Sequence, residues 1–329
     1  MSRPRRKRGG IGRPFGLLLI VIVLLIGAVL WSWYGAGPLA KPATVTIAEG
    51  STVASAGRDL EKAGAIRGAG LFRHLAGLLG SRDPIRAGQY AIPAHASQAA
   101  ILDILQHGKP VQLLVTIPEG MPSVMVRDRL AAIPVLTDPA PLPPEGSVLP
   151  DSYAYQKGET RAAVLKRMQE AMKRYLADAW AHRAKGLVVK SPREALILAS
   201  IVEKETALPE ERATVAAVYE NRLKLNMPLQ ADPTTIYPIT KGRALGRRIL
   251  ESELRDKNGY NTYTMPGLPV GPICNPGRKS IAAVLHPAAS KALYFVANGK
   301  GGHVFADTLA EQNANVKKWY AIRHARGEM

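Results

Sequence analysis

The chain has 329 residues, a formal net charge of +18 at pH 7, one cysteine and a hydrophobic fraction of 47%. This length allows a membrane segment and about two domains, and the hydrophobic fraction is ample for a folded core. The single Cys274 excludes an intramolecular disulfide and a metal site built from several cysteines. The positive charge favours anionic partners: nucleic acid, anionic lipid or an anionic cell-wall polymer.

The N-terminus has a basic head followed by a long uncharged stretch. Residues 1–14 carry six of the positive charges and no acid, which leaves +12 on the remainder. The next twenty residues, 15–34, carry no charge, and a helix of that length spans roughly 30 Å of hydrocarbon. We predict a cytoplasmic tail over 1–14 and a transmembrane helix over 15–34, with Trp31, Trp33 and Tyr34 at the far interface. A cleaved signal peptide is the alternative.

Both interpretations place the rest of the chain outside the cytoplasm. That location argues against nucleic acid as the partner of the basic surface. Residues 35–43, rich in Gly, Pro and Ala, are predicted to be a linker.

Residues 44–116 alternate short strand and helix patterns and are predicted to form a small α/β subdomain. Ser51 and Ser97 are the expected N-caps of two of its helices. Strands are expected at 44–47, 89–92 and 111–117, and helices at 51–64, 71–79 and 97–108.

Residues 132–147, dense in proline and polar turns, are predicted to be a loop between domains, and a larger, mixed α+β domain is expected in the second part of the chain. Thr160 is the expected cap of a long helix, and Thr308 with Glu311 forms a capping box for the last one. Two apolar strands, 292–297 and 303–306, flank a Gly-rich turn and predict a hairpin. Residues 226–280 show little regular pattern, and loops of that length usually carry function.

The stretch 195–206 is the strongest local signal in this larger domain. Its first eight residues are apolar or small, which predicts a helix buried nearly all round, and the run ends at Glu203, Lys204 and Glu205. The two glutamates cannot share a helix face, so one can be paired while the other points into a cleft. Glu205 continues the buried line and is the candidate for an acid with a raised pKa. An ordinary charged helix end is the alternative.

Two later loops, 229–237 and 260–263, contain amide, hydroxyl and phenol groups, which suit the binding of sugar hydroxyls and acetamido groups. The alternative is that these residues only make turns. Three such polar loops in succession, counting 267–276, favour a carbohydrate cleft. The candidate substrate-binding residues are Gln230, Asp232, Thr234, Tyr260, Asn261, Thr262 and Tyr263. No spacing supports a metal site, and His286 and His303 are expected to be structural.

From about residue 44 onward the chain resembles the YceG-like family of endolytic murein transglycosylases, also called MltG. The motifs that carry the resemblance are Arg86-Ala-Gly-Gln-Tyr90, Ile117-Pro-Glu-Gly120, Glu145-Gly-Ser-Val-Leu-Pro-Asp-Ser-Tyr153, Ala199-Ser-Ile-Val-Glu-Lys-Glu-Thr206, Leu229-Gln-Ala-Asp-Pro-Thr234, Tyr260-Asn-Thr-Tyr263, Gly267-Leu-Pro-Val-Gly-Pro272 and Leu293-Tyr-Phe-Val-Ala297 with Gly-Gly-His303.

The resemblance implies a single N-terminal span, a LysM-like subdomain over 44–116 and a catalytic transglycosylase domain over 117–329. The second Glu of the Glu-Lys-Glu motif, Glu205, would be the catalytic acid. The implied reaction cleaves the β-1,4 bond between N-acetylmuramic acid and N-acetylglucosamine in peptidoglycan and leaves a 1,6-anhydro end. It needs neither a metal nor an organic cofactor.

The implied location is the inner membrane, with the catalytic domain in the periplasm. Because the linker is short, we expect internal cuts in new glycan strands that end their elongation. The expected neighbour is a glycan synthase of the penicillin-binding-protein type. Two alternatives stay open: a two-carboxylate muramidase with Glu203, Asp232 or Asp151 as second acid, and a non-catalytic peptidoglycan-binding scaffold for synthases.

Overall fold

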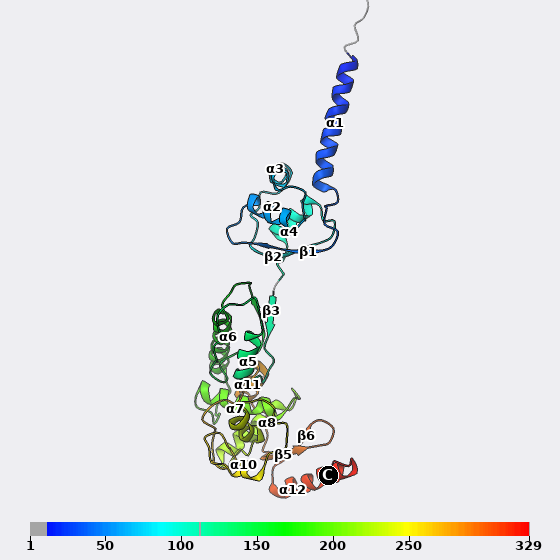
Figure 1. Cartoon of the computed structure of the whole chain (residues 1–329). Helices are drawn as coiled ribbons and strands as arrows, with labels where there is room; N and C mark the ends of the chain where they lie inside the picture. The colour runs from blue at the N-terminus through cyan, green and yellow to red at the C-terminus, as the bar shows by residue number, and fades with distance from the viewer. Residues whose placement is uncertain (1–11, 112, 329) are drawn as a thin grey trace, which may run out of the picture. The chain divides into compact units, whose positions relative to one another are not determined.

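The computed structural model describes residues 12–111 and 113–328, which form twelve helices and six short strands (Figure 1). The chain divides into two compact units, residues 1–112 and 113–329. The architecture is mixed α and β, as the sequence predicts. Most of the predicted cytoplasmic tail, residues 1–11, lies outside the described residues.

Helix α1 (Gly12–Tyr34) is the one described helix that is long and apolar enough to cross a membrane. The window Gly16–Tyr34 has a mean hydropathy of 2.6 and is almost wholly exposed. Trp31 and Tyr34 are exposed too, but Trp33 is only 1% exposed, because its ring packs on Phe72 in the core of unit 1. The expectation that all three aromatic rings face an interface is therefore wrong for Trp33.

Unit 1 builds a small core from one two-stranded sheet and three helices. The strands pair antiparallel, with Ala43 opposite Ile92, and their inner face buries Val45 and Tyr90. The predicted Ser97 cap is confirmed, but Thr52 rather than Ser51 caps the first helix. In chain order the elements after α1 are β1 (Ala43–Ile47), α2 (Val53–Lys62), α3 (Ala69–Leu79), β2 (Gly88–Ile92) and α4 (Gln98–His107).

The predicted linker, residues 35–43, lies against unit 1. The N–H of Gly37 donates to the carbonyl of His95, and the N–H of His95 donates to the carbonyl of Leu39. A Cβ at Gly37 would lie 2.2 Å from the carbonyl oxygen of Ala96, so only glycine allows this approach. The end of α1 is thus joined to unit 1 by a packed segment.

Unit 2 is mainly helical and carries two separate antiparallel strand pairs, β3 with β4 and β5 with β6. The second pair is the predicted hairpin, and Thr308 with Glu311 forms the predicted capping box. Its elements are β3 (Leu113–Thr116), α5 (Ser123–Ala131), β4 (Ser152–Tyr155), α6 (Arg161–Ala181), α7 (Pro192–Glu205), α8 (Arg212–Lys224), α9 (Asp232–Thr240), α10 (Glu251–Arg255), α11 (Arg278–Leu285), β5 (Tyr294–Ala297), β6 (His303–Ala306) and α12 (Leu309–Ala325).

Two features of unit 2 were not predicted from the sequence. Strand β3, which the sequence analysis includes in residues 44–116, pairs with β4, so its partner lies in unit 2. The segment 226–280 contains helices α9 and α10, which the sequence analysis did not predict, because prolines and short length hide their periodicity.

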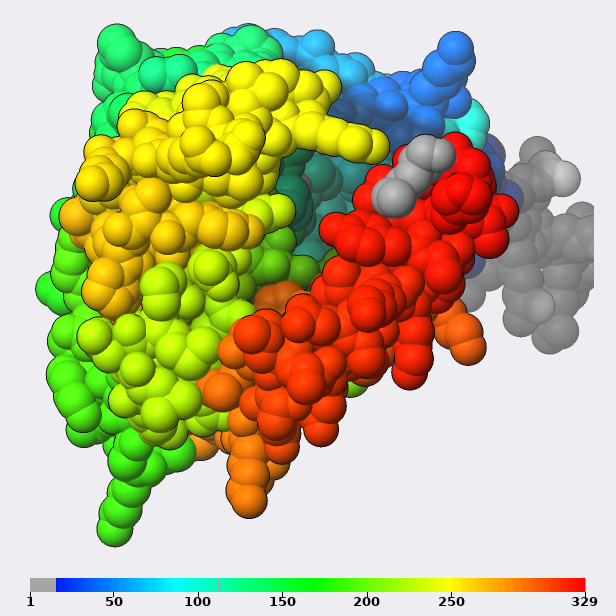
Figure 2. All heavy atoms as spheres, turned by 90° about the horizontal axis from the view of Figure 1, so that it is seen from below, coloured from blue at the N-terminus to red at the C-terminus, as the bar shows by residue number. Residues whose placement is uncertain are grey.

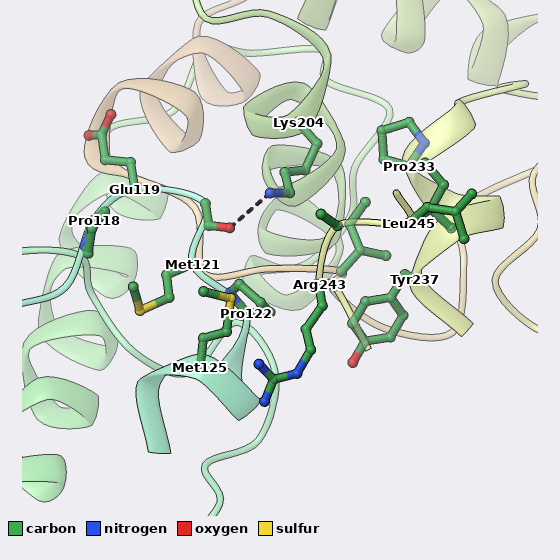
Figure 3. A pocket seen from close by; sticks show the side chains of 15 residues that line it. Pro118, Glu119, Met121, Pro122, Met125, Lys204, Pro233, Tyr237, Arg243 and Leu245 are labelled. Atoms are coloured by element: carbon green, nitrogen blue, oxygen red, sulfur yellow. Dashed lines mark hydrogen bonds between the residues drawn. The ribbon is translucent and has the colours of Figure 1, made fainter. Parts of the chain in front are cut away.

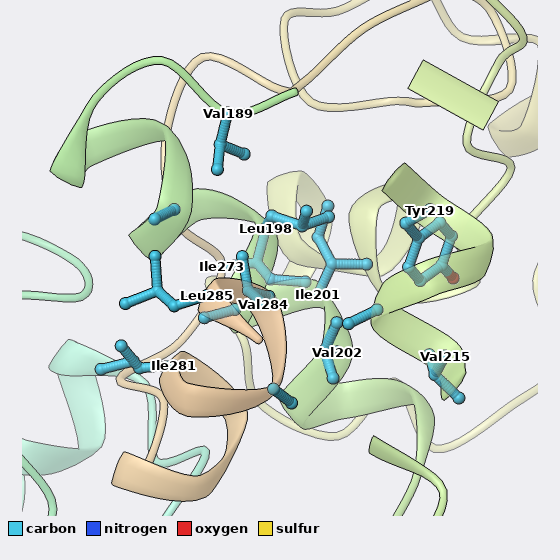
Figure 4. Packing of buried hydrophobic residues seen from close by; sticks show 14 of the residues in the cluster. Val189, Leu198, Ile201, Val202, Val215, Tyr219, Ile273, Ile281, Val284 and Leu285 are labelled. Atoms are coloured by element: carbon cyan, nitrogen blue, oxygen red, sulfur yellow. The ribbon is translucent and has the colours of Figure 1, made fainter. Parts of the chain in front are cut away.

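The core of unit 2 surrounds α7. Apolar side chains of α7, including Leu198, Ile201 and Val202, are fully buried, as predicted. They pack against α8 and α11, and Figure 4 shows side chains from these three helices converging on one cluster. Burying an apolar side chain of this size is worth roughly 1.5–3 kcal/mol, so α7 is held rigidly up to its C-terminal turn.

Candidate active site

Helix α7 ends at the candidate acid. Its last turn carries Glu203, Lys204 and Glu205, and the backbone leaves the helical conformation at Thr206. Thr206 Oγ1 donates to a carboxyl oxygen of Glu211 (3.1 Å), and the ring Nδ1 of His303 lies 2.7 Å from the same oxygen. These contacts hold the β5–β6 hairpin next to the end of α7. His303 therefore has a structural role, as expected.

Glu203 is buried and fully paired. Its Oε2 accepts the N–H of Gly277 (2.9 Å), its Oε1 lies 3.4 Å from Arg212 Nη2, and its side chain is 5% exposed. A Cβ at Gly277 would come within 2.1 Å of the carboxyl end of the Glu119 side chain, which would have to move. A buried carboxylate with two such partners acts as a brace between α7, α8 and the start of α11.

Glu205 has a different environment. The residue is half-buried, but its Oε1 is fully buried and accepts no hydrogen bond from the described residues. Burial raises the pKa of Glu205 to about 7; Tyr219 and Arg222 oppose the rise, and the charge of Asp232 adds to it. A carboxyl with a pKa near neutrality can both give and take a proton, which is what a general acid–base needs.

Helix α8 supplies two of these neighbours, and the sequence analysis missed both. Tyr219 is 1% exposed, and burial raises the pKa of its phenol well above the usual value, so it remains a donor toward Glu205. The guanidinium of Arg222 donates to the carbonyls of Leu293 (2.7 Å) and Leu229 (2.9 Å). Tyr219 and Arg222 are three residues apart and so lie on one face of α8, and this spacing is the sequence signal that could have revealed them.

Gln230, Asp232 and Tyr263 form a polar surface that we call the Asp232 wall. The hydroxyl of Tyr263 donates to Asp232 Oδ1 at 2.5 Å, and the Asp232 side chain is exposed. Gln230 is exposed, has a left-handed backbone (φ 51°), and its Oε1 accepts from Arg222 (3.3 Å). Of the predicted substrate-binding residues, Gln230, Asp232 and Tyr263 thus present polar groups on the side of Glu205.

Three other predicted residues, Thr234, Asn261 and Thr262, are completely buried beneath this wall. The amide of Asn261 donates to three backbone carbonyls between residues 253 and 256. The hydroxyls of Thr234 and Thr262 share a hydrogen bond (2.8 Å), and Thr262 also accepts the N–H of Ala231. These side chains hold the start of α9 against the loop 260–263 and have no exposed surface to contact a sugar.

Tyr260, the last of the predicted set, is half-buried, and its ring lies 4.8 Å from that of Tyr237. The hydroxyl of Tyr237 donates to Glu145 (3.1 Å), and burial raises the pKa of that carboxyl. Tyr260 therefore belongs to an aromatic pair that is anchored on a second buried acid.

A pocket of about 480 Å³ adjoins the end of α7. Its lining includes Lys204 and Pro233, the chain neighbours of Glu205 and Asp232, together with Met125, Tyr237 and Arg243 (Figure 3). Lys204 Nζ donates to the carbonyl of Gly120, as the dashed line in Figure 3 marks. This volume lies within the usual range for sites that bind small molecules or parts of polymers.

In Figure 2, which draws all heavy atoms of the chain as spheres, a hollow lies between the segment around α10 (yellow) and helix α12 (red). In the part of the chain that the structure describes, no cluster of three or more His, Cys, Asp or Glu side chains could hold a metal ion. The chemistry available on this face is that of carboxyl, phenol and amide groups.

The profile of the YceG-like family matches residues 45–318. The chain belongs to the YceG-like family. A crystal structure of a YceG-like protein from Listeria monocytogenes has a TM-score of 0.53 and 26% identity, and covers 83% of this chain and 98% of its own.

Two relatives are named endolytic murein transglycosylase. The protein from Bacillus subtilis is 35% identical over 185 residues, which cover 56% of this chain and 50% of the relative. The one from Streptococcus pneumoniae D39 is 29% identical over 326 residues, which cover 84% of this chain and 58% of the relative. This YceG-like chain thus spans little more than half the length of the curated relatives that it matches.

Proposed function

We propose that this chain is a membrane-anchored endolytic lytic transglycosylase. It would cleave the β-1,4 bond between N-acetylmuramic acid and N-acetylglucosamine in peptidoglycan. The observation that carries this proposal is Glu205: an acid at the end of a buried helix, with one unpartnered oxygen and a pKa of about 7. The names of the relatives support the same reaction.

In this reaction Glu205 first donates its proton to the glycosidic oxygen, and the bond from that oxygen to C1 of the muramoyl residue breaks. The C6 hydroxyl of the same sugar then bonds to C1, and the Glu205 carboxylate takes the hydroxyl proton. The acid is regenerated, no water is consumed, and a 1,6-anhydro end remains. One carboxyl that titrates near neutrality is sufficient for both proton transfers.

Asp232 favours a second candidate, a two-carboxylate muramidase. Its charge raises the pKa of Glu205, so the two carboxyls are near enough to interact. The other two acids considered, Glu203 and Asp151, are engaged elsewhere: Glu203 with Gly277, and Asp151 with Arg278 at 2.9 Å. In a muramidase Asp232 would activate a water or attack C1, and water would end in the product.

The decisive experiment is mass analysis of products from uncrosslinked glycan strands. The sample should be the full chain in detergent. Removing the N-terminal residues 1–35 would take Trp33 out of the core of unit 1. Anhydro ends support the transglycosylase, and products heavier by one water support the muramidase. Glycan binding without cleavage, by protein with a normal melting curve, would favour the non-catalytic scaffold.

The proposal includes a topology. α1 would span the membrane with the N-terminus in the cytoplasm and the catalytic unit in the periplasm, since the basic head precedes the span. An enzyme reporter that works only outside the cytoplasm should be active when fused after Met329. Recovery from cells of a soluble protein that lacks residues 1–34 would refute the anchor.

We also propose that unit 1 is LysM-like and that the enzyme ends the growth of new strands beside a glycan synthase. The strand–helix–helix–strand order from β1 to β2 supports the first part. The packed segment 35–43 supports the second, because it holds unit 1 close to the end of α1. Replacing 35–43 with a flexible linker several times longer should lengthen the glycan strands of cells that rely on the variant.

A further inference from the structure

Helix α3 presents an unusual outer face in unit 1. Leu71 is 49% exposed and Leu78 is 74% exposed, and the seven-residue spacing places them on one side of the helix. In the described part of unit 1 outside α1, the only other large exposed apolar side chain is Val111. The remaining exposed residues of this face are Gly70, Arg73, His74 and Gly77, so it carries no acid.

The buried side of helix α3 contacts the C-terminal end of α1. The ring of Phe72 in α3 is 6.1 Å from that of Trp33, which is buried between α1 and unit 1. Gln98 in α4 donates to the carbonyl of Ser32 at 2.9 Å and fixes the last turn of α1 a second time. In Figure 1, α3 lies on the side of unit 1 from which α1 leaves, and the β1–β2 sheet lies on the opposite side.

The length of α1 sets the depth of α3. The apolar window Gly16–Tyr34 has 19 residues, and at 1.5 Å per residue it extends about 28 Å, close to the roughly 30 Å of the hydrocarbon layer. One membrane boundary therefore falls near Trp33, and Trp33 touches Phe72. A helix in that contact is at the level of the lipid headgroups.

We propose that α3 is an interfacial helix whose outer face lies on the outer surface of the lipid bilayer. This proposal relies on the transmembrane anchor proposed above. Leu71 and Leu78 would enter the boundary of the acyl chains, while Arg73 and the flanking Arg67 and Arg82 would meet lipid phosphates. The helix would fix the height and tilt of unit 1 relative to the bilayer. A single span can tilt in the bilayer, and unit 1 would tilt with it.

The test uses the full chain in vesicles that contain phosphatidylglycerol, with a polarity-sensitive fluorophore on one new cysteine. The native Cys274 is fully buried and should not react. Leu78→Cys reports the outer face of α3, and Thr46→Cys, exposed on β1, is the matched control on the opposite side. Leu24→Cys, 67% exposed in α1, reports the anchor itself.

Brominated lipid tails should quench the label at position 78 by at least about half, because interfacial helices bury their apolar face roughly 5–10 Å. The label at position 46 should keep its emission, and the label at position 24 should be quenched. Equal, unquenched emission at 78 and 46, together with quenching at 24, would overturn the role of α3 and leave the anchor intact. Unquenched emission at 24 would refute the anchor and this inference with it.

Discussion

The two glutamates at the end of α7 stand two residues apart and have opposite environments. Glu203 is buried with a guanidinium and a backbone N–H, so its charge is balanced and the group serves as a brace. Glu205 has a buried oxygen without a partner, and burial raises its pKa to about 7. A buried carboxylate with partners stabilises the fold, whereas a buried carboxyl without a partner has a raised pKa and can act as an acid.

The largest expected effect is the loss of activity in Glu205→Gln. The amide keeps the shape of the side chain but cannot transfer a proton, and a general acid contributes about 10²–10⁴-fold to a rate. Glycan cleavage, measured by chromatography of the products, should fall by at least that factor. The melting temperature should not fall. A folded Glu205→Gln variant with normal activity would remove Glu205 from the mechanism.

Glu203→Gln should give the reverse result. Removing one partner of a buried ion pair costs about 3–5 kcal/mol, because the charge of Arg212 loses its partner. Urea unfolding should show this loss, reduced by the second partner of Arg212, Glu119. Well below the melting temperature, cleavage should remain within a few-fold of the wild type. An inactive but stable variant would contradict the assignment of a structural role to Glu203 and of the catalytic role to Glu205.

The pH dependence of stability separates the two environments further. An acid whose pKa is raised by folding holds its proton more tightly in the folded state. Stability is therefore lost as pH rises from the ordinary value of about 4.5 to about 7. Relative to the wild type, Glu205→Gln should gain up to about 3 kcal/mol between pH 4.5 and 8 in urea titrations. A constant difference would show that Glu205 is not buried as an acid.

Asn261→Ala tests the buried layer beneath the Asp232 wall. Its amide holds three carbonyls, and leaving buried acceptors unpaired costs about 1–3 kcal/mol. We expect a lower melting temperature together with lower activity. Asp232→Asn is the matched control: its exposed side chain should change activity with little change in melting temperature. Unchanged stability in Asn261→Ala would argue for direct contact with substrate.

The smallest effect is expected for Tyr219→Phe. The ring still fills the core, so the cost should be about 1 kcal/mol or less. Because the phenol favours the ionised form of Glu205, its loss should raise the pKa of Glu205 and move the alkaline limb of kcat/KM to higher pH. A limb that stays in place while activity falls would indicate a packing role alone.

Periodicity and composition alone predicted the apolar span, the buried helix before Glu205, the β5–β6 hairpin and the mixed α and β class. These features depend on neighbours within one turn or one pair of strands, so local pattern suffices. For Glu203 and Glu205 the sequence predicted only that the two side chains lie on different faces of the helix. The sequence could not identify the partners of Glu203, because Arg212 lies on the next helix, α8, and Gly277 lies 74 residues further along the chain.

Only the tertiary structure decided which polar loop residues face solvent. Asp232 and Asn261 come from similar polar stretches of the sequence, yet one is exposed and the other fully buried, since the packing of such stretches has no periodic signal. The same holds for Trp33, which joins the core of unit 1 because Phe72 and Gln98 approach the end of α1. These contacts, Trp33 with Phe72 and Ser32 with Gln98, join residues 39 and 66 positions apart, which no local pattern encodes.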